Sequence, residues 1–316
     1  MTTTPAPTDH DRSGLTLRFL AAPTDEGYAG RVSGGRVLEW IDKAAYAAAV
    51  AWSRHYCVTA YVGDVHFGTP IRVGDLVEVE ARIVHTGRSS MDVRVQVRTG
   101  SPRTGELSVA TECLTVFVAM QDGRSVAIPS YTPTTADQRE AEADALRHKE
   151  IRAVIERELT NMPPESELHA PGRTMRFLAR PTDVNWGGNV HGGNVMDWID
   201  EAAHVLATQW TRSTCNVAVY VGGVRFLQPM HIGDLVEIQA RLMRTGRTSM
   251  HMTVDVRSGD PAGDAPSLTT RCHLVFVAIG DADQPQEVPA WTPTTAGDRA
   301  LERHAAALLA ASGNTF

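Results

Sequence analysis

The sequence predicts an α+β protein in which one fold occurs twice, each copy being an antiparallel sheet wrapped around a long central helix. Three observations predict it: an internal repeat, an alanine-rich segment with helical periodicity in each copy, and alternating apolar and polar segments after it. Gly34–Ala45 returns as Gly192–Ala203, at an offset of 192 − 34 = 158 residues, and Thr86–Met91 returns as Thr245–Met250, at 245 − 86 = 159. So long a period indicates two copies of one domain, because solenoid repeats recur roughly every 20–50 residues.

Each copy opens with a short apolar strand, at residues 15–21 and 174–179, which is followed by Pro-Thr-Asp and a glycine-rich loop. The loop leads into the central helix, predicted at residues 35–54 and 193–212. In the first helix Leu38, Ile41 and Ala45 lie on one face by their spacing. The many alanines around them indicate that the sheet encloses this helix closely.

Four strands are predicted after the first central helix, at residues 61–67, 76–84, 91–98 and 111–120. In the second of these, apolar residues such as Val77 and Val79 alternate with Glu78 and Glu80. This alternation is typical of an antiparallel sheet that is covered on one face.

The repeat divides the chain into five segments. Two charged segments, 134–160 and 294–312, are helical in character, and we expect each to be a surface helix of its own repeat, the first also serving as a linker. The predicted segments are a disordered tail (1–14), a first domain (15–135), a helical linker (136–172), a second domain (173–295) and a C-terminal helix (296–316).

Composition excludes several classes of partner. The formal net charge is −7, whereas a nucleic-acid-binding protein needs a basic face. No apolar run approaches the roughly 20 residues that cross a bilayer, and the first residues lack the features of a secretory signal. We therefore expect no nucleic acid, no membrane and a cytoplasmic location.

The cysteines indicate neither disulfides nor a metal site. Cys57, Cys113, Cys215 and Cys272 look like two positions that each occur twice, without CxxC spacing or histidine partners at ligand distances. We expect buried, reduced thiols and no metal.

Asp42 and Asp200 are candidate catalytic residues because each lies within the apolar face of its helix. An unpaired buried carboxylate is costly, so two of them in equivalent places suggest a functional role. The Gly-Gly pair at the start of each helix leaves backbone N–H groups open to a ligand on which negative charge develops. A tight turn that needs glycine would account for the pair equally well.

The combined motifs resemble the double-hotdog acyl-CoA thioesterases, the cytosolic acyl-CoA hydrolase family. The resemblance rests on Asn185-x3-Asn189-Val190-His191-Gly192-Gly193-x6-Asp200-Glu201-Ala202, followed by Gly246-Arg247-Thr248-Ser249 and a Phe-Val-Ala strand. It implies tandem hotdog folds paired as a pseudo-dimer, with sites at the seam between the repeats. It also implies hydrolysis of acyl-CoA to CoA and a carboxylic acid, a role in lipid metabolism, and no cofactor apart from the CoA of the substrate.

The resemblance assigns residues to two unequal sites. The family's helix carboxylate, a general base or a nucleophile, falls on Asp42 and Asp200. The family's carbonyl-binding asparagine falls on Asn185, but its counterpart in the first repeat is Gly27. The predicted active seam therefore combines Asp42 and Thr59 with Asn185, His191 and the Gly192 N–H, and the opposite seam is a degenerate site with Asp200 and Gly34.

The Gly-Arg-Ser/Thr turns are candidate CoA-binding segments, because a guanidinium beside hydroxyl groups suits phosphates. They comprise Arg88, Ser89 and Ser90 in the first repeat, and Arg247, Thr248 and Ser249 in the second. A solvated arginine in a hairpin turn is the alternative.

Two other functions stay open. Hotdog hydratases or dehydratases of acyl thioesters use a histidine with an acidic partner, but Ser33 replaces His191 in the first repeat. A non-catalytic acyl-CoA-binding protein is the other alternative. For assembly, sheets joined edge to edge should leave apolar outer surfaces, and the family commonly forms trimers, so we expect a homotrimer.

Overall fold

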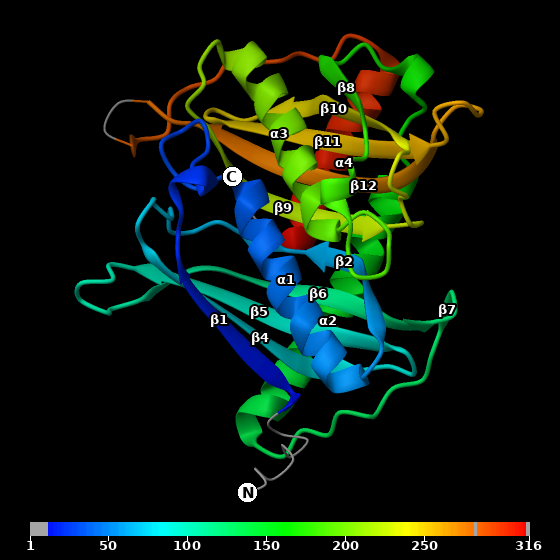
Figure 1. The fold of residues 1–316 in the computed structure, drawn as a ribbon. Helices are drawn as coiled ribbons and strands as arrows, with labels where there is room; N and C mark the ends of the chain where they lie inside the picture. The colour runs from blue at the N-terminus through cyan, green and yellow to red at the C-terminus, as the bar shows by residue number, and fades with distance from the viewer. Residues whose placement is uncertain (1–11, 281–282, 314–316) are drawn as a thin grey trace, which may run out of the picture.

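The two repeats share one continuous antiparallel sheet. The computed structural model describes residues 12–280 and 283–313, so most of the predicted disordered tail (1–14) lies outside it, although Gly14 already begins the first strand. The order along the sheet is β1 (Gly14–Leu20), β4 (Leu76–Thr86), β5 (Ser90–Gly100), β6 (Ser108–Gln121), β2 (Tyr56–Gly63), β9 (Asn216–Phe226), β12 (Ser267–Ala278), β11 (Ser249–Gly259), β10 (Leu235–Thr245) and β8 (Gly172–Leu178) (Figure 1). Two short strands pair off this path, β3 (Val65–His66) with β9 and β7 (Arg124–Ser125) with β6.

The repeats join where β2 meets β9. Tyr61 pairs with Arg225 and Val62 with Val224, so equivalent strands of the two copies meet at the seam. The predicted pseudo-dimer therefore exists within one chain. The strand predicted at 61–67 is wrong in its bounds, because Asp64 has a φ of 52° and interrupts the extended backbone between β2 and β3.

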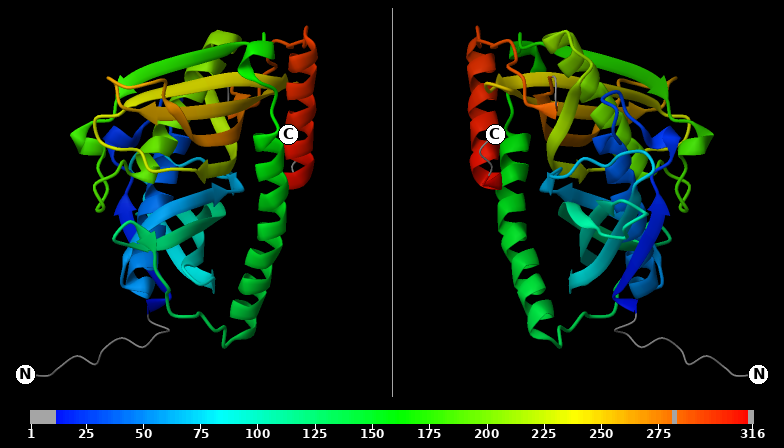
Figure 2. Two further views of the ribbon diagram at one scale, coloured as in Figure 1. Left: turned by 90° about the vertical axis from the view of Figure 1, so that its right-hand side faces the viewer. Right: turned by 90° about the vertical axis from the view of Figure 1, so that its left-hand side faces the viewer.

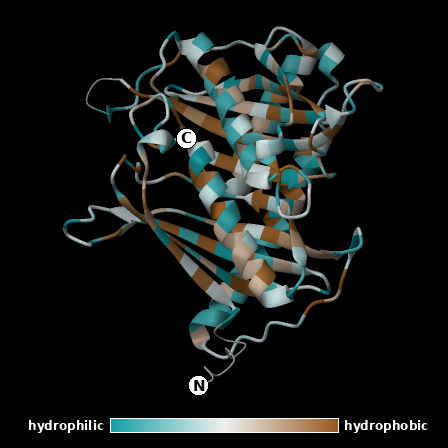
Figure 3. Cartoon of the chain, viewed as in Figure 1, coloured by the Kyte–Doolittle hydropathy of each residue, from teal (hydrophilic) through white to brown (hydrophobic). Residues whose placement is uncertain are grey.

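The central helices α1 (Gly34–Ser53) and α3 (Gly192–Thr211) lie side by side on one face of this sheet (Figure 1). In α1, Leu38, Ile41 and Ala45 are fully buried, as their spacing predicts. The strands alternate as predicted, and Figure 3 shows the resulting bands of apolar and polar residues. Burial of these apolar faces is the main stabilising contribution to each domain.

The first turns of α1 and α3 pack so closely that only glycine fits at one position in each. A Cβ on Gly35 would lie 2.7 Å from the Cα of Asp197, and one on Gly193 would lie 3.0 Å from the Cα of Glu39. The second glycine of each Gly-Gly pair is therefore required for helix packing, which also brings each helix N-terminus beside the carboxylates of the other helix.

Two further helices, α2 (Ala136–Thr160) and α4 (Ala296–Ser312), lie on the opposite face of the sheet (Figure 2). The prediction of a surface helix of its own repeat, serving also as a linker, does not include the contacts that α2 makes with the second repeat. Its C-terminal residues Ile155 and Leu159 join a buried cluster with Met243 of β10 and Leu301 of α4. The segment thus crosses the seam and packs against the second repeat.

The outer sheet surface of the first repeat is charged, which contradicts the expected apolar surface. Glu80 pairs with Arg98 at 2.6 Å, and Arg94 donates a 2.7 Å hydrogen bond to Glu112. These side chains form cross-strand ion pairs on the sheet face, where an apolar surface for a neighbouring subunit was expected.

The cysteine positions also need one correction. Cys57 pairs with Ala119 of β6, whereas Asn216 pairs with the equivalent Ala278 of β12. The counterpart of Cys57 is therefore Asn216, because one residue is inserted between α3 and β9. Cys57, Cys113 and Cys272 are buried free thiols and Cys215 is exposed.

Candidate active site

The residues predicted for the active seam lie around one cavity of about 670 Å³ between the repeats. The first repeat supplies Asp42 from α1 and Thr59 from β2. The second supplies Asn185, His191 and Gly192 from the loop before α3 and from its first turn. A site made from both repeats is complete only in the folded double unit.

The Asp42 carboxylate is buried and held at both oxygens. It is 2 % exposed; its Oδ1 accepts a 2.7 Å hydrogen bond from Thr59 Oγ1, and its Oδ2 accepts a 3.0 Å bond from the Gly193 N–H. Burial raises the pKa of Asp42 above its ordinary value, while nearby His191, the Thr59 hydroxyl and the Gly193 N–H oppose that rise. The group is thus oriented and kept more basic than an exposed aspartate.

Gly192 leaves room directly in front of this carboxylate. A Cβ there would lie 3.1 Å from Thr59 Oγ1 and 3.3 Å from Asp42 Oδ2. Its own N–H, the first of helix α3, has no hydrogen-bond acceptor among the described residues. An open N–H at a helix N-terminus, on a residue beside the Asp42 carboxylate, is suited to bind an oxygen on which negative charge develops.

His191 caps α3 and lies against Asp42. Its Nδ1 accepts a 3.0 Å hydrogen bond from the Gly193 N–H and lies 3.2 Å from Asp42 Oδ2. The Gly193 N–H is therefore shared by the imidazole and the carboxylate. His191 thus orders the helix start, and its imidazole lies directly against the Asp42 carboxylate.

The Asn185 carboxamide has a fixed orientation. Its Oδ1 accepts hydrogen bonds from the Gly187 N–H at 2.8 Å and the Asn189 N–H at 3.1 Å. Its Nδ2 consequently faces the first repeat, where it donates to the Tyr56 hydroxyl at 3.1 Å, with the Val190 carbonyl 3.5 Å away. The amide donor is directed into the seam.

An aromatic pair, which the sequence analysis missed, forms a wall of this cavity. Tyr46 of α1 and Trp186 of the Asn185 loop stack with ring centroids 4.4 Å apart. Their counterparts in the opposite seam, His204 and Tyr28, also stack, at 4.9 Å. Ring side chains at the same two repeat positions were the signal that could have identified them.

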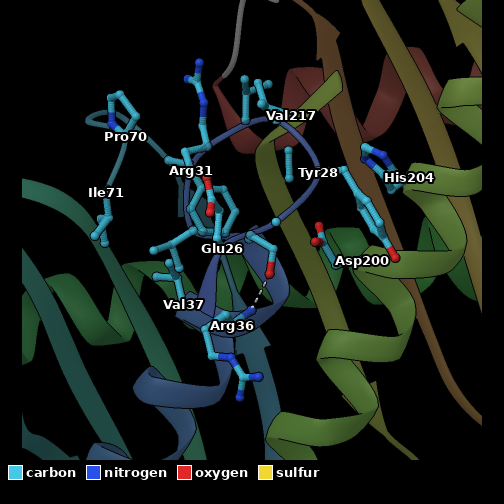
Figure 4. Close-up of a pocket in the computed structure, with 18 of the residues that line it drawn as sticks. Glu26, Tyr28, Arg31, Arg36, Val37, Pro70, Ile71, Asp200, His204 and Val217 are labelled. Atoms are coloured by element: carbon cyan, nitrogen blue, oxygen red, sulfur yellow. Dashed lines mark hydrogen bonds between the residues drawn. The ribbon is translucent and has the colours of Figure 1, made fainter. Parts of the chain in front are cut away.

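The opposite seam contains a second cavity, of about 580 Å³, with Asp200 on its wall (Figure 4). Ala218 occupies the place of Thr59, since a Cβ on Gly34 would lie 3.1 Å from both Ala218 Cβ and Asp200 Oδ1. Gly27 lines the cavity in place of Asn185, and Ser33 caps the helix in place of His191.

Asp200 lacks the hydroxyl and imidazole contacts that Asp42 makes. It is 7 % exposed and its Oδ1 has no hydrogen-bond partner. Burial raises the pKa of Asp200 to about 7; the Gly35 N–H opposes this, and nearby Asp197 and Glu201 add to it. What separates Asp200 from Asp42 is therefore its missing partners, since burial raises the pKa of both groups.

The two cavities also differ in charge. The Asp200 cavity is lined by six carboxylates, namely Asp25, Glu26, Asp197, Asp200, Glu201 and Asp283. Its arginines are already paired, Arg36 with Asp25 and Arg31 with Asp283. The Asp42 cavity is lined by only two carboxylates, Asp42 and Asp122, so it opposes a polyanionic ligand less.

The predicted CoA-binding turns lie outside both cavities. Arg88 and Ser89 lie in the turn between β4 and β5, which begins at Ser90; Arg247 and Thr248 lie in the turn between β10 and β11, which begins at Ser249. Arg88 is exposed, and Arg247 is 75 % exposed and lies 3.6 Å from Glu287. Neither arginine contacts Asp42, Asp200 or Asn185, so any role in binding concerns a part of the ligand outside the cavities.

Neither a metal cluster nor a membrane-spanning helix is found in the part of the chain that the structure describes. No group of three histidine, cysteine or acidic side chains there could hold a metal ion. None of the described helices is long and apolar enough to cross a bilayer.

A helix enclosed by an antiparallel sheet, occurring twice with a carboxylate at each seam, defines a double-hotdog protein. A model of the thioesterase superfamily matches residues 29–106 and again residues 187–265. The chain belongs to this superfamily and contains two copies of its domain. The predicted family and the predicted tandem hotdog fold are both confirmed.

The chain is similar to known thioester hydrolases along most of its length. It is 24 % identical to mouse acyl-coenzyme A thioesterase 11, over 87 % of this chain and 49 % of that protein. It is also 24 % identical to the human cytosolic acyl coenzyme A thioester hydrolase, over 90 % of this chain and 79 % of that one. The chain thus spans about half the length of the mouse relative.

A solved structure from Lactobacillus plantarum supports the fold. That protein, described provisionally as an oleoyl thioesterase, covers 85 % of this chain and 98 % of its own, with a TM-score of 0.60 and 11 % identity. At this identity the likeness concerns the double-hotdog arrangement alone.

Proposed function

We propose that this chain is an acyl-CoA thioesterase that hydrolyses acyl-CoA to CoA and a carboxylic acid at the Asp42 seam. The observation that carries the proposal is one cavity that Asp42, fixed by Thr59 and Gly193, lines together with Gly192, whose N–H is open, and Asn185. A base beside two donors is what attack on a thioester carbonyl requires. The thioester hydrolases among the relatives support the same reaction.

In this proposal the thioester carbonyl oxygen accepts hydrogen bonds from the Gly192 N–H and Asn185 Nδ2. Asp42 takes a proton from water as the water oxygen attacks the carbonyl carbon, and the Thr59 hydroxyl keeps the carboxylate in place. The C–S bond then breaks, and the thiolate of CoA leaves and takes up the proton. Direct attack by an Asp42 oxygen, with later hydrolysis of the anhydride, uses the same contacts.

The Asp200 seam is proposed to contribute little hydrolysis. It lacks the carboxamide at Gly27 and the hydroxyl at Ala218, so neither the carbonyl nor the carboxylate is held as in the Asp42 seam. The acidic residues that line it outnumber its two paired arginines, and their excess negative charge also opposes the phosphates of CoA.

Matched substitutions in the two repeats test this function. Asp42→Asn should lower kcat for thiol release from acyl-CoA by roughly 10²–10⁴-fold, because the water loses its base. Asp200→Asn removes the same group from the equivalent helix and should leave most of the activity.

Thiol release, measured with acyl-CoA of several chain lengths, gives kcat for both variants and the substrate range of the wild type. An inactive Asp200→Asn beside an active Asp42→Asn would place the reaction in the other seam. Equal partial losses would mean that both seams work, and a wild-type chain without thiol release would refute the function.

The contact between His191 and Asp42, at 3.2 Å, favours an acyl-thioester hydratase or dehydratase as the second candidate. Such an enzyme would add water to the double bond of an enoyl-CoA without releasing a thiol. Loss of the enoyl absorbance without thiol release would select this alternative.

From the family resemblance alone, since the expected apolar outer surface is absent from the first repeat, we also propose a homotrimer of double-hotdog chains. We propose a cytoplasmic location, acyl-CoA as the substrate, and no cofactor apart from the CoA of the substrate. The three free thiols buried in the core are consistent with a reducing compartment. Arg88 and Arg247, with their neighbouring hydroxyl residues, are proposed to bind the phosphates of CoA at the surface.

A further inference from the structure

Tyr56 of β2 touches the residue that is proposed to bind the thioester carbonyl, although it belongs to the other repeat. Asn185 Nδ2 donates to the Tyr56 hydroxyl at 3.1 Å, and both side chains line the Asp42 cavity. The Oδ1 of Asn185 is occupied by two backbone N–H groups, so the amide cannot turn over. One Nδ2 hydrogen is thus committed to Tyr56, and the other has only the Val190 carbonyl, 3.5 Å away.

The backbone of the Asn185 loop is shaped around the Tyr56 ring. A Cβ on Gly187 would lie 2.1 Å from Tyr56 Cζ, so no larger residue fits while the ring is there. Gly187 therefore permits the approach that brings the phenol to the carboxamide.

The opposite seam differs at all three positions together. In the first repeat, Tyr56 pairs with Met120 of β6. In the second repeat, the counterpart of Met120 is Ile279, whose N–H donates to the Cys215 carbonyl. Cys215 therefore occupies the place of Tyr56. At the repeat offset of 158, Gly27 replaces Asn185 and Ala29 replaces Gly187. The loop thus has glycine, at position 187, in the seam that contains the Tyr56 ring, and alanine, at position 29, in the seam that lacks it.

We infer that Tyr56 is a positioning residue for Asn185, an inference that rests on the proposed thioesterase function. By accepting one amide hydrogen, the Tyr56 hydroxyl directs the second hydrogen of Asn185 to the thioester carbonyl. The carbonyl oxygen then replaces the long contact to Val190. Tyr56 thus acts from the first repeat on the oxyanion donor of the second.

Tyr56→Phe is the direct test, because it removes the hydroxyl and keeps the ring against Gly187. Loss of one neutral hydrogen bond should lower kcat by about 3- to 10-fold and leave KM for acyl-CoA little changed. Cys215→Ala, at the equivalent place in the other seam, is the matched control and should have wild-type kinetics. A Tyr56→Phe variant with wild-type kcat would overturn the inference.

A double-substitution cycle separates positioning from general damage to the fold. Asn185→Ala alone should cost roughly 10²–10³-fold in kcat. In that background Tyr56→Phe should have no further effect, because its target is gone. If the two losses multiply, Tyr56 does not act through Asn185 and the inference is wrong.

The glycine supplies a second, independent cycle. Gly187→Ala should lower kcat at least as far as Tyr56→Phe, since the Cβ displaces the ring. In a Tyr56→Cys background, Gly187→Ala should cause no further loss of kcat. The double variant then has the same pair of residues as Ala29 and Cys215 in the other seam. An equal loss in both backgrounds would overturn the inference alone, whereas a wild-type chain that releases no thiol would overturn the proposed function as well.

Discussion

Replacing Asp200 by asparagine should change how stability depends on pH, and the structure gives the size of the change. The ordinary pKa of 3.8 rises to about 7 in the folded protein because the group is buried, with Oδ1 unpartnered. At about 1.4 kcal/mol per unit, a shift of about three units corresponds to about 4 kcal/mol.

The sign follows from the protons bound by each state. Between about pH 4 and pH 7 the folded chain keeps the Asp200 proton that the unfolded chain has lost, so the free energy of unfolding falls as the pH rises. This contribution is fully present below pH 4 and is lost above pH 7. Asp200→Asn removes this contribution. The free energy of unfolding of the variant, relative to that of the wild type, should therefore rise by up to about 1.4 kcal/mol per pH unit over that window and stay constant above it.

Urea unfolding of both proteins at several pH values between 4.5 and 8.5 measures this difference. The asparagine amide also needs a partner, which adds a constant penalty of about 1–3 kcal/mol, so the slope rather than the absolute difference is the test. Asp298→Asn is the control. Asp298 accepts hydrogen bonds from the His169 and Ala170 N–H groups, its pKa is lowered to about 2, and its effect should therefore be flat across this range. A flat difference for Asp200→Asn as well would refute the reasoning.

Two further predictions concern the surface. If Arg88 or Arg247 binds phosphate, its replacement by alanine should raise KM for acyl-CoA by roughly 10- to 150-fold with little change in kcat, because the nucleotide is bound alike in the ground and transition states. Steady-state kinetics on both variants decide this, and an unchanged KM in each would make them ordinary turn residues. Light scattering should give the mass of three chains; a mass near the 34.3 kDa of one chain at micromolar concentration would exclude the trimer.

The sequence predicted the central helices and the strand faces well, because both depend on local periodicity. Leu38 and Ile41 on α1, and Val77 and Val79 on β4, are buried as their spacing requires. The repeat also showed that the two seams differ, since the comparison of Asn185 with Gly27 needs no coordinates.

The errors arose where a contact is made by residues far apart in the chain. The C-terminal half of α2 has a sequence that fits a surface helix, and only the tertiary structure shows Ile155 against Met243 and Leu301. Tyr56 was missed for the same reason: its partner, Asn185, is 129 residues away in the other repeat. A one-residue insertion likewise hid the true counterpart of Cys57, which only strand pairing reveals.

The fusion of two hotdog units in one chain explains how the seams can differ. In a symmetric dimer of single units, one sequence supplies the carboxylate and the amide to both sites, so losing the asparagine would disable both. Here each seam takes its carboxylate from one repeat and its loop from the other. Glycine at position 27 therefore affects only the Asp200 seam, and Tyr56 with Gly187 can be fitted to Asn185 without any constraint from the opposite side. The same independence lets five further carboxylates line the cavity of Asp200, while only one besides Asp42 lines the other cavity, which stays open to an anionic substrate.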